Sequence, residues 1–281
     1  MWRDSIVTRL REAARPDLAE PLDKCHREKS VMQCCSCRAA RVFWNRCELK
    51  HCPICAERLA KERRKTVEWW TKEIHQPKHL VLTALNTTNL CAEYFLWFKQ
   101  QFAKLRRSKC ARNWRGGFYS IETTWNESGA HVHLHILLDC NWVNISEVAI
   151  VWGRLLQQEF AICKIKDARD KSYLAEVAKY VVKGSELASW TGSKLVTFLD
   201  AIANVRMFGV FGTLYKKRAE LRDWLDTLRS LRNKCDCGCK TFRVLDEQSF
   251  EWQEIVRELN IGNAPPPKIP AAEPQLSFAL K

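Results

Sequence analysis

The clearest pattern of polar and apolar positions lies in residues 129–138, which read Gly-Ala-His-Val-His-Leu-His-Ile-Leu-Leu. Successive side chains of a β-strand point to opposite faces, so this alternation predicts a strand with a buried aliphatic face. The imidazoles of His131, His133 and His135 then share the other face. Because neutral imidazole is the commonest metal ligand, three histidines in one register favour a metal site over an ordinary half-buried strand.

A second strand is expected directly before the histidine strand. Residues 117–125 are rich in β-branched and aromatic side chains, and residues 126–129 have turn chemistry. The two strands should therefore form an antiparallel hairpin, with Glu122 near the histidines. Glu122 is therefore a candidate for a further metal ligand beside the histidines. An exposed strand glutamate is the alternative, because the register is not fixed by the sequence.

Hydrophobic periodicity predicts a mixture of further helices and strands. A short helix should end near Pro16 and be followed by a loop. Strands are expected at residues 79–86 and 162–165, and a strand or close-packed loop at 206–212. Helices are expected at about residues 92–107, 144–160, 193–203 and 216–232.

Residues 172–184 predict a helix with a serine N-cap and a glycine stop. Its apolar residues form one stripe, and its polar residues gather on the opposite side. That polar row consists of Tyr173, Glu176, Tyr180 and Lys183. An ordinary amphipathic helix is the alternative interpretation, so the row gains weight only beside a metal site and a basic surface.

The cysteine content indicates zinc rather than disulfides. The chain has 14 cysteines, but its N-terminus lacks the apolar core of a signal peptide. No run approaches the ~18 apolar residues that a membrane span needs. Closely spaced cysteines in such a basic chain more often bind zinc, so we expect a cytoplasmic protein without a membrane partner.

The N-terminal cysteines lie in two pairs with the spacing of zinc knuckles. One pair is Cys34 with Cys37, and the other is Cys52 with Cys55. Cys47 makes an equally good three-ligand frame with the second pair, which an early cysteine would complete. Six thiols, with Cys35 counted, compete for four places, and His51 is a further candidate.

A C-terminal group, Cys235, Cys237 and Cys239, offers a possible second zinc site. Three ligands within five residues need a fourth ligand from elsewhere in the chain. The proline-rich tail at residues 261–281 is expected to be extended or disordered.

The charge of the chain indicates a polyanionic partner. The formal net charge is +14, and 12 tryptophans add aromatic surface that can stack on exposed bases. The basic helix expected at residues 57–65 would either lie along phosphates or present a solvated face.

A metal ion, a tyrosine with a basic neighbour and a polyanionic partner together indicate phosphoryl transfer to the tyrosine hydroxyl. The hydroxyl of Tyr180 would attack phosphorus and release a 3′-hydroxyl. An unperturbed phenol has a pKa of about 10, so the metal and Lys183 would favour the phenolate or balance the developing charge. Glu176 would later activate water or orient a second nucleophile.

In these motifs the chain resembles the HUH endonucleases of rolling-circle replication, most of all plasmid replication initiators with one tyrosine per site. The matches run in the family's order and cover residues 31–215. Residues 79–85 are similar to the first motif, residues 130–138 to the second, and Glu176-x3-Tyr180-x2-Lys183 to the third. The frame of Cys47, Cys52 and Cys55 resembles the zinc element that precedes the nuclease domain. Residues 206–212 are similar to a segment after the tyrosine helix.

The resemblance implies an α+β fold, with a central antiparallel sheet that carries the histidines, flanking helices and an N-terminal zinc-binding module. It implies His133 and His135 as ligands of Mg²⁺ or Mn²⁺, and either Glu122 or His131 would be the third ligand. It also implies Tyr180 as nucleophile and Glu176 as the residue that directs water. The implied reaction nicks single-stranded or hairpin origin DNA and leaves a 5′-phosphotyrosine. Host helicase and DNA polymerase would then act at the free 3′-hydroxyl.

Two departures and two rival functions accompany the resemblance. Val132 stands where relatives often have proline, and Tyr173 leaves a second nucleophile open. One rival is a transposase or relaxase-like strand transferase with the same site. The other is a zinc-dependent DNA-binding protein without catalysis.

The expected domain order is an N-terminal segment, a zinc module, the nuclease domain, a basic helix with a cysteine-rich region, and the tail. These are residues 1–30, 31–65, 75–215, 216–260 and 261–281.

Overall fold

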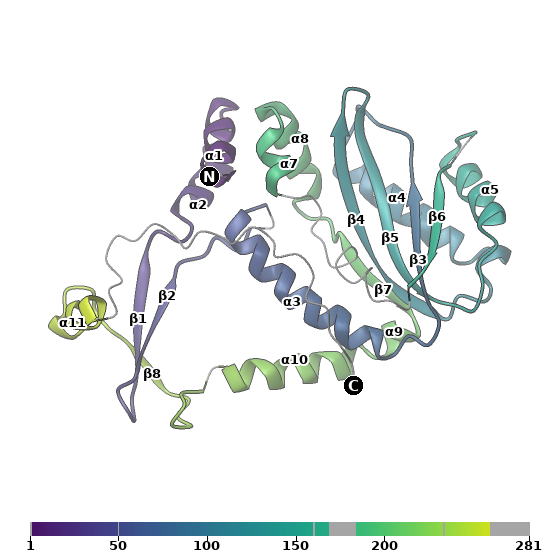
Figure 1. The fold of residues 1–281 in the computed structure, drawn as a ribbon. Coiled ribbons are helices and arrows are strands. Elements are labelled where there is room, and N and C mark those ends of the chain that lie inside the picture. Colours follow the sequence, from purple (N-terminus) through teal and green to yellow (C-terminus); the bar gives the residue numbers. More distant parts are fainter. Residues whose placement is uncertain (1, 50, 160, 169–183, 233, 259–281) are drawn as a thin grey trace. The chain divides into compact units, whose positions relative to one another are not determined.

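The chain is organised around two antiparallel sheets with helices beside them, which confirms the predicted α+β class (Figure 1). The computed structural model describes residues 2–49, 51–159, 161–168, 184–232 and 234–258. It divides into two compact units. The larger consists of Met1–Lys24 with Cys47–Leu231, and the smaller of Cys25–Arg46 with Arg232–Lys281.

The larger unit holds a five-stranded sheet with the strand order β6-β3-β5-β4-β7. All four neighbouring pairs are antiparallel. The strands are β3 (Pro77–Thr83), β4 (Gly116–Asn126), β5 (Gly129–Asp139), β6 (Cys163–Asp167) and β7 (Phe208–Gly212). The histidine strand, β5, is therefore the central strand, and the segment expected at residues 206–212 is a strand.

The β4–β5 hairpin turns through a two-residue loop between Asn126 and Gly129. The side chain of Asn126 accepts a hydrogen bond from the backbone of Ser128 at 2.9 Å. Gly129 has φ +116°, and a Cβ there would lie 2.5 Å from the carbonyl oxygen of Thr87. Only glycine fits at position 129, which fixes where the turn lies. Because the turn has two residues, its position sets the register of the whole hairpin.

Helices begin and end close to the expected places in most of the larger unit. They are α1 (Trp2–Glu12), α2 (Pro16–Lys24), α3 (Pro53–Thr71), α4 (Ala92–Leu105), the 3₁₀ turn η1 (Lys109–Ala111), α5 (Ile145–Leu156), α7 (Gly184–Ser189), α8 (Gly192–Ile202), α9 (Thr213–Lys216) and α10 (Arg218–Arg232).

The N-terminal helices differ from the expectation at one point. Pro16 begins α2, where a loop was expected. Proline suits the first turn of a helix because its missing N–H would have no partner there. The buried side chains Ile6, Leu10 and Leu22 show why both helices form, since each lays an apolar face against the unit.

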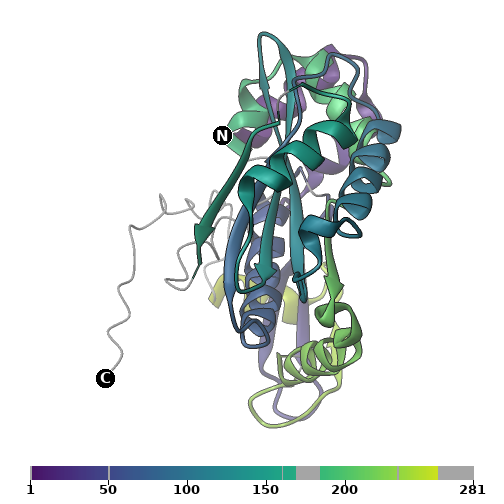
Figure 2. The ribbon, with the colours of Figure 1, turned by 90° about the vertical axis from the view of Figure 1, so that its right-hand side faces the viewer.

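Two helices cover the aliphatic face of the sheet. Figure 2 shows α4 and α5 in front of the sheet, on one side of it. The ring of Phe102 in α4 lies edge-on to Tyr119 of β4 at 5.4 Å. Trp152 of α5 is buried, and its indole N–H donates to the carbonyl oxygen of Thr83 at 2.8 Å. The buried aromatic residues thus fix one face of β5 against the core.

The other face, which carries the histidines, is covered at one end by α3 and α10. Val67, Trp70 and Leu221 from these helices form one buried cluster with Phe118 of β4 and Leu137 of β5. Phe118 and Leu137 are paired in the register and lie at the end of the hairpin far from its turn. The histidines occupy the stretch of β5 between this cluster and the turn.

The smaller unit is a three-stranded antiparallel sheet with the order β2-β1-β8. Its elements are β1 (Lys29–Cys34), β2 (Ala40–Trp44), β8 (Phe242–Val244) and α11 (Phe250–Glu258). The ammonium of Lys29 lies over the ring of Trp252 in α11, 5.5 Å from its centroid. Segments that the sequence analysis placed in separate modules therefore meet in one sheet.

Candidate functional site

The three histidines of β5 lie on one face of the central strand. His131, His133 and His135 are each half-buried, and the aliphatic residues between them are fully buried. The rings of His131 and His133 lie 4.1 Å apart, and those of His133 and His135 lie 6.2 Å apart. The alternation in the sequence thus corresponds to two different faces of β5, one partly accessible to solvent and one buried in the core.

Glu122 is the direct cross-strand neighbour of His133. Directly opposed residues of an antiparallel pair point to the same face, so the carboxylate joins the histidines. Nε2 of His135 lies 2.9 Å from Oε2 of Glu122, and both side chains are largely buried, with exposed fractions of 14% and 17%. The expected proximity of Glu122 to the histidines is present in the structure.

His79 is a fourth histidine on this face, which the sequence analysis assigned only to a strand. It lies opposite Leu137 on β3, in the same side-chain layer as His135. Nε2 of His79 lies 3.3 Å from Nδ1 of His135, and the two rings stack at 5.5 Å. With Nε2 of His135 donating to Glu122, its Nδ1 is free to accept from His79. His79 and Glu122 together orient the ring of His135.

The environment keeps His133 neutral at physiological pH. Burial lowers the pKa of His133 to about 4, and the neighbouring charges of His131 and His135 act in the same direction. Burial also lowers the pKa of His131. A neutral imidazole carries a lone pair, so this face meets the protonation requirement for a metal ligand.

The donor set of His133, His135 and Glu122 has the mixed nitrogen and oxygen chemistry that suits Mn²⁺, whereas Mg²⁺ prefers oxygen ligands alone. The set is not as tightly gathered as the thiols described below. In the described part of the chain, the cysteines alone form groups whose ligand atoms all lie within 4.8 Å of one another.

The expected nucleophile lies outside the described residues. Residues 169–183 contain Tyr173, Glu176, Tyr180 and Lys183, so the structure does not place the polar row relative to the histidines. Helix α7 begins at Gly184, where the sequence analysis expected a helix to end.

One thiol group joins the two ends of the smaller unit. It consists of Cys34, Cys37, Cys235 and Cys237. The sulfurs of Cys34 and Cys237 lie 3.6 Å apart, and those of Cys37 and Cys235 lie 3.4 Å apart. Four sulfurs around a tetrahedral Zn²⁺ would lie about 3.8 Å apart, given a Zn–S bond of about 2.3 Å. The group could hold zinc with little movement.

Both halves of this group sit on tight turns. After the first half, Arg38 has φ +59° and donates its N–H to the carbonyl of Cys34 at 3.0 Å. After the second, Gly238 has φ +88° and donates to the carbonyl of Cys235 at 2.8 Å. The N–H of Cys237 and the side chain of Cys37 lower the pKa of Cys235 to about 7. The turn thus favours the thiolate at Cys235. At Cys37, the contacts with Cys235 and Cys237 outweigh the N–H of Ala39 and raise the pKa to about 12, so a cation is needed to hold both as thiolates.

The second thiol group lies in the larger unit and includes Cys47, Cys52 and Cys55. The sulfurs of Cys47 and Cys55 lie 3.8 Å apart. Cys52 is the N-cap of α3, where Pro53 opens the helix and the N–H of Cys55 points at its sulfur. The adjacent Cys52 raises the pKa of the Cys47 thiol, so a cation is needed to hold both as thiolates.

The thiol groups match one of the two frames that the sequence suggested, the frame of Cys47, Cys52 and Cys55. Cys34 and Cys37 join the C-terminal cysteines and not Cys52 and Cys55. Cys239 belongs to neither group, and its sulfur lies 3.4 Å from the carbonyl oxygen of Thr241. His51 also stays outside, buried, with no hydrogen-bond partner at Nε2.

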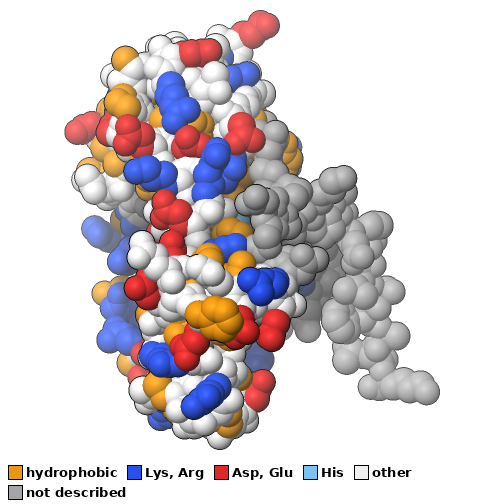
Figure 3. All heavy atoms as spheres, turned by 90° about the vertical axis from the view of Figure 1, so that its left-hand side faces the viewer, with side chains coloured by type: hydrophobic (Ala, Val, Ile, Leu, Met, Phe, Trp, Pro, Cys, Tyr) orange, Lys and Arg blue, Asp and Glu red, His pale blue; other side chains and the backbone are white. Residues whose placement is uncertain are grey.

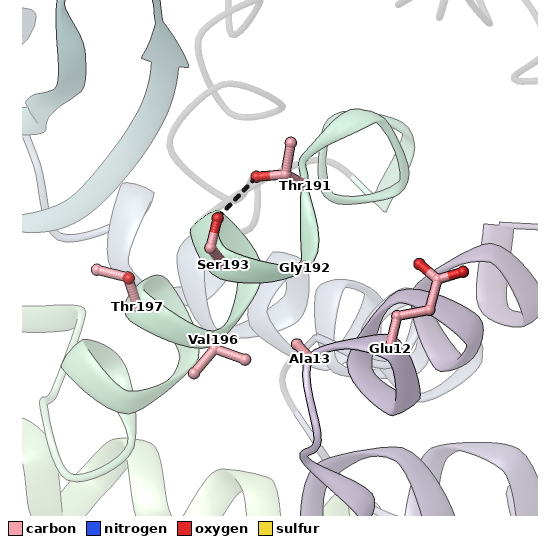
Figure 4. A pocket seen from close by; sticks show the side chains of 7 residues that line it. All are labelled: Glu12, Ala13, Thr191, Gly192, Ser193, Val196 and Thr197. Atoms are coloured by element: carbon pink, nitrogen blue, oxygen red, sulfur yellow. Dashed lines mark hydrogen bonds between the residues drawn. The ribbon is translucent and has the colours of Figure 1, made fainter.

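A further pocket lies where α1 meets the start of α8 (Figure 4). The hydroxyls of Thr191 and Ser193 point toward one another at 3.1 Å, and Glu12 lines the pocket from α1. A carboxylate beside a helix N-terminus disfavours an anion there. None of the predicted site residues lines this pocket.

The excess positive charge is not gathered into a single patch on the face drawn in Figure 3, where Lys and Arg side chains alternate with Asp and Glu side chains. Among the described helices, none is both long and apolar enough to cross a membrane.

Comparison of the chain with protein-family models, with characterised protein sequences and with solved structures found no match.

Proposed function

We propose that this chain is a metal-dependent single-strand DNA endonuclease and strand transferase of the HUH type. The observation that carries the proposal is the side-chain layer of His133, His135 and Glu122 on the central hairpin of an antiparallel sheet. A divalent cation held there would polarise a phosphodiester and stabilise the charge that develops on it.

The residues of the chain have separate tasks in this proposal. Glu122 holds Nε2 of His135, and a cation bound at Nδ1 of this ring would replace its present contact with His79. The hydroxyl of Tyr180 forms a bond to phosphorus as the bond to the 3′-oxygen breaks. The phenol gives up its proton, and the leaving oxygen becomes a 3′-hydroxyl. Lys183 balances the phenolate charge, and Glu176 directs the water or second nucleophile that ends the reaction.

The tyrosines in the described part of the chain support the assignment of Tyr180. Burial raises the pKa of Tyr94 to about 12, and burial also raises the pKa of Tyr119. Tyr94 lies in α4 and contacts Trp97 of the same helix, and Tyr119 of β4 contacts Phe102 of α4. Tyr215 is exposed, and the guanidinium of Arg218 covers its ring at 3.4 Å. Tyr180 and Tyr173 are the two tyrosines that belong to the polar row predicted from the sequence.

The finer proposal is a plasmid rolling-circle replication initiator that acts on single-stranded or hairpin origin DNA in the cytoplasm. It rests on the pairing of Glu176 with Tyr180 in the sequence and on the thiol groups, which are proposed to bind Zn²⁺. Host helicase and DNA polymerase are the proposed partners after nicking. The same chemistry would serve a transposase.

The second candidate is a zinc-dependent DNA-binding protein without catalysis. The observation that favours it is the tighter geometry of the two thiol groups compared with the histidine layer. In that case the histidines would be structural, and the positive charge alone would account for DNA binding.

Metal-dependent cleavage separates the two candidates. Purified protein would be incubated with Mn²⁺ and a labelled, randomised single-stranded DNA library that includes hairpins. The proposal predicts cleavage that is lost in EDTA and in a His133→Ala/His135→Ala variant. It should persist in His75→Ala, a control at an exposed histidine outside the sheet. Binding of DNA without cleavage by the wild-type protein would favour the second candidate.

A further inference from the structure

The edge strand β6 carries two lysines on the histidine face. In the register, Lys164 lies opposite Val81, and Lys166 lies opposite His79. Val81 in turn lies opposite His135 on β5. Opposed residues share a face, so both lysines project into the layer that contains the histidines and Glu122.

The lysines are close to the histidines in space. Neighbouring strands are about 4.8 Å apart, so Lys164 starts about 10 Å from His135 across β3.

Both lysines are exposed, whereas Ile165 between them is half-buried. Lys78, on the adjacent strand β3, differs from these two lysines in its face and in its partner. It points to the other face and forms an ion pair with Asp167 at 2.9 Å. Two residues along a strand advance by about 6.6 Å, which lets Lys164 and Lys166 reach successive phosphates of an extended strand.

We infer that Lys164 and Lys166 form a phosphate-binding edge that holds single-stranded DNA beside the histidine layer. This inference rests on the proposed function, because it assigns the substrate of the same site. The lysines would bind phosphates next to the one that is cut, and would position the strand without contacting the reacting atoms.

A different role for these lysines follows from the position of β6. Sheet edges often carry lysine because its charge prevents pairing with the edge of another molecule. That role requires no ligand, and loss of the lysines would cause self-association while leaving DNA affinity unchanged. The two roles therefore predict different measurements.

The test measures binding in EDTA, so that cleavage plays no part. A fluorescent 20-nucleotide oligothymidylate would be titrated with protein at several salt concentrations. For Lys164→Gln/Lys166→Gln we expect an affinity loss of about 10-fold, and a salt slope smaller by about 1.4 because two phosphate contacts are lost. Lys164→Arg/Lys166→Arg should restore both values.

Lys104→Gln is the matched control, since Lys104 is exposed on α4, which covers the opposite face of the sheet. It should change neither value by as much as the double glutamine variant. The inference is overturned if the double glutamine variant binds like the wild type, or if the wild type does not bind the probe. Failure of the proposed function looks different: the wild type would bind the probe and the double glutamine variant would bind it more weakly, but the wild type would not cleave DNA in Mn²⁺.

Discussion

Nε2 of His135 lies 2.9 Å from Oε2 of Glu122, across the two central strands of the sheet. This contact fixes which ring nitrogen of His135 carries its proton and places a carboxylate among imidazoles. A carboxylate that holds a histidine in this way tunes its affinity for metal.

Replacement of Glu122 by alanine should therefore weaken metal binding. We expect the affinity for Mn²⁺ to fall by about 10-fold or more, because a charged oxygen and the orientation of His135 are both lost. Isothermal titration calorimetry would measure it. Glu127→Ala, an exposed glutamate in the turn of the same hairpin, serves as control and should retain wild-type affinity. Equal affinities in the two variants would remove Glu122 from the site.

The protonation of His133 should occur at unusually low pH. Because burial and two neighbouring histidines disfavour its charged form, NMR in EDTA should give a midpoint near 4. The unfolded chain takes up this proton near pH 6.5, so the free energy of unfolding should decrease as pH falls from about 6.5 to 4. A midpoint near 6.5 for His133 would show that its environment is aqueous.

The grouping of thiols predicts the zinc content of variants. The wild-type protein should bind two zinc ions, and Cys37→Ser or Cys235→Ser should reduce this to one. Cys35→Ser and Cys239→Ser are matched controls within the same two turns and should keep two. Zinc released by a thiol reagent would be quantified with a colorimetric chelator. A loss of zinc in Cys239→Ser, with retention in Cys235→Ser, would contradict the grouping.

The sheet should not tolerate a side chain at Gly117. A Cβ there would lie 2.3 Å from the carbonyl oxygen of Leu137 and 3.0 Å from the ring of Phe211. Gly117→Ala would force β4 away from β5, and we expect a loss of about 1–3 kcal/mol in the free energy of unfolding. Urea denaturation would measure the loss, and an unchanged midpoint would mean that the strands are less closely paired there.

The histidine hairpin could be predicted because its information is local. Alternation marks the strand, and the turn at Asn126 and Gly129 sets the register that brings Glu122 to His133. The sequence does not reveal that His79 is a neighbour of His135, since that contact depends on the pairing of β3 with β5, which no local pattern fixes.

The thiol groups show the same limit. Spacing identifies Cys34 with Cys37, and Cys235 with Cys237, as pairs of ligands. It does not say which pairs combine, because two local turns can meet across any length of chain. The antiparallel pairing of β1 with β8 brings them together, and this pairing could not be read from three residues of β8.

The central claim is tested most directly by locating a covalent DNA adduct. Wild-type protein, Mn²⁺ and the single-stranded library would be incubated, and the adduct digested and sequenced by mass spectrometry. The account predicts a phosphodiester on Tyr180 that is absent in Tyr180→Phe and in EDTA. An adduct on Tyr173 or Tyr215, or one that survives EDTA, would contradict it.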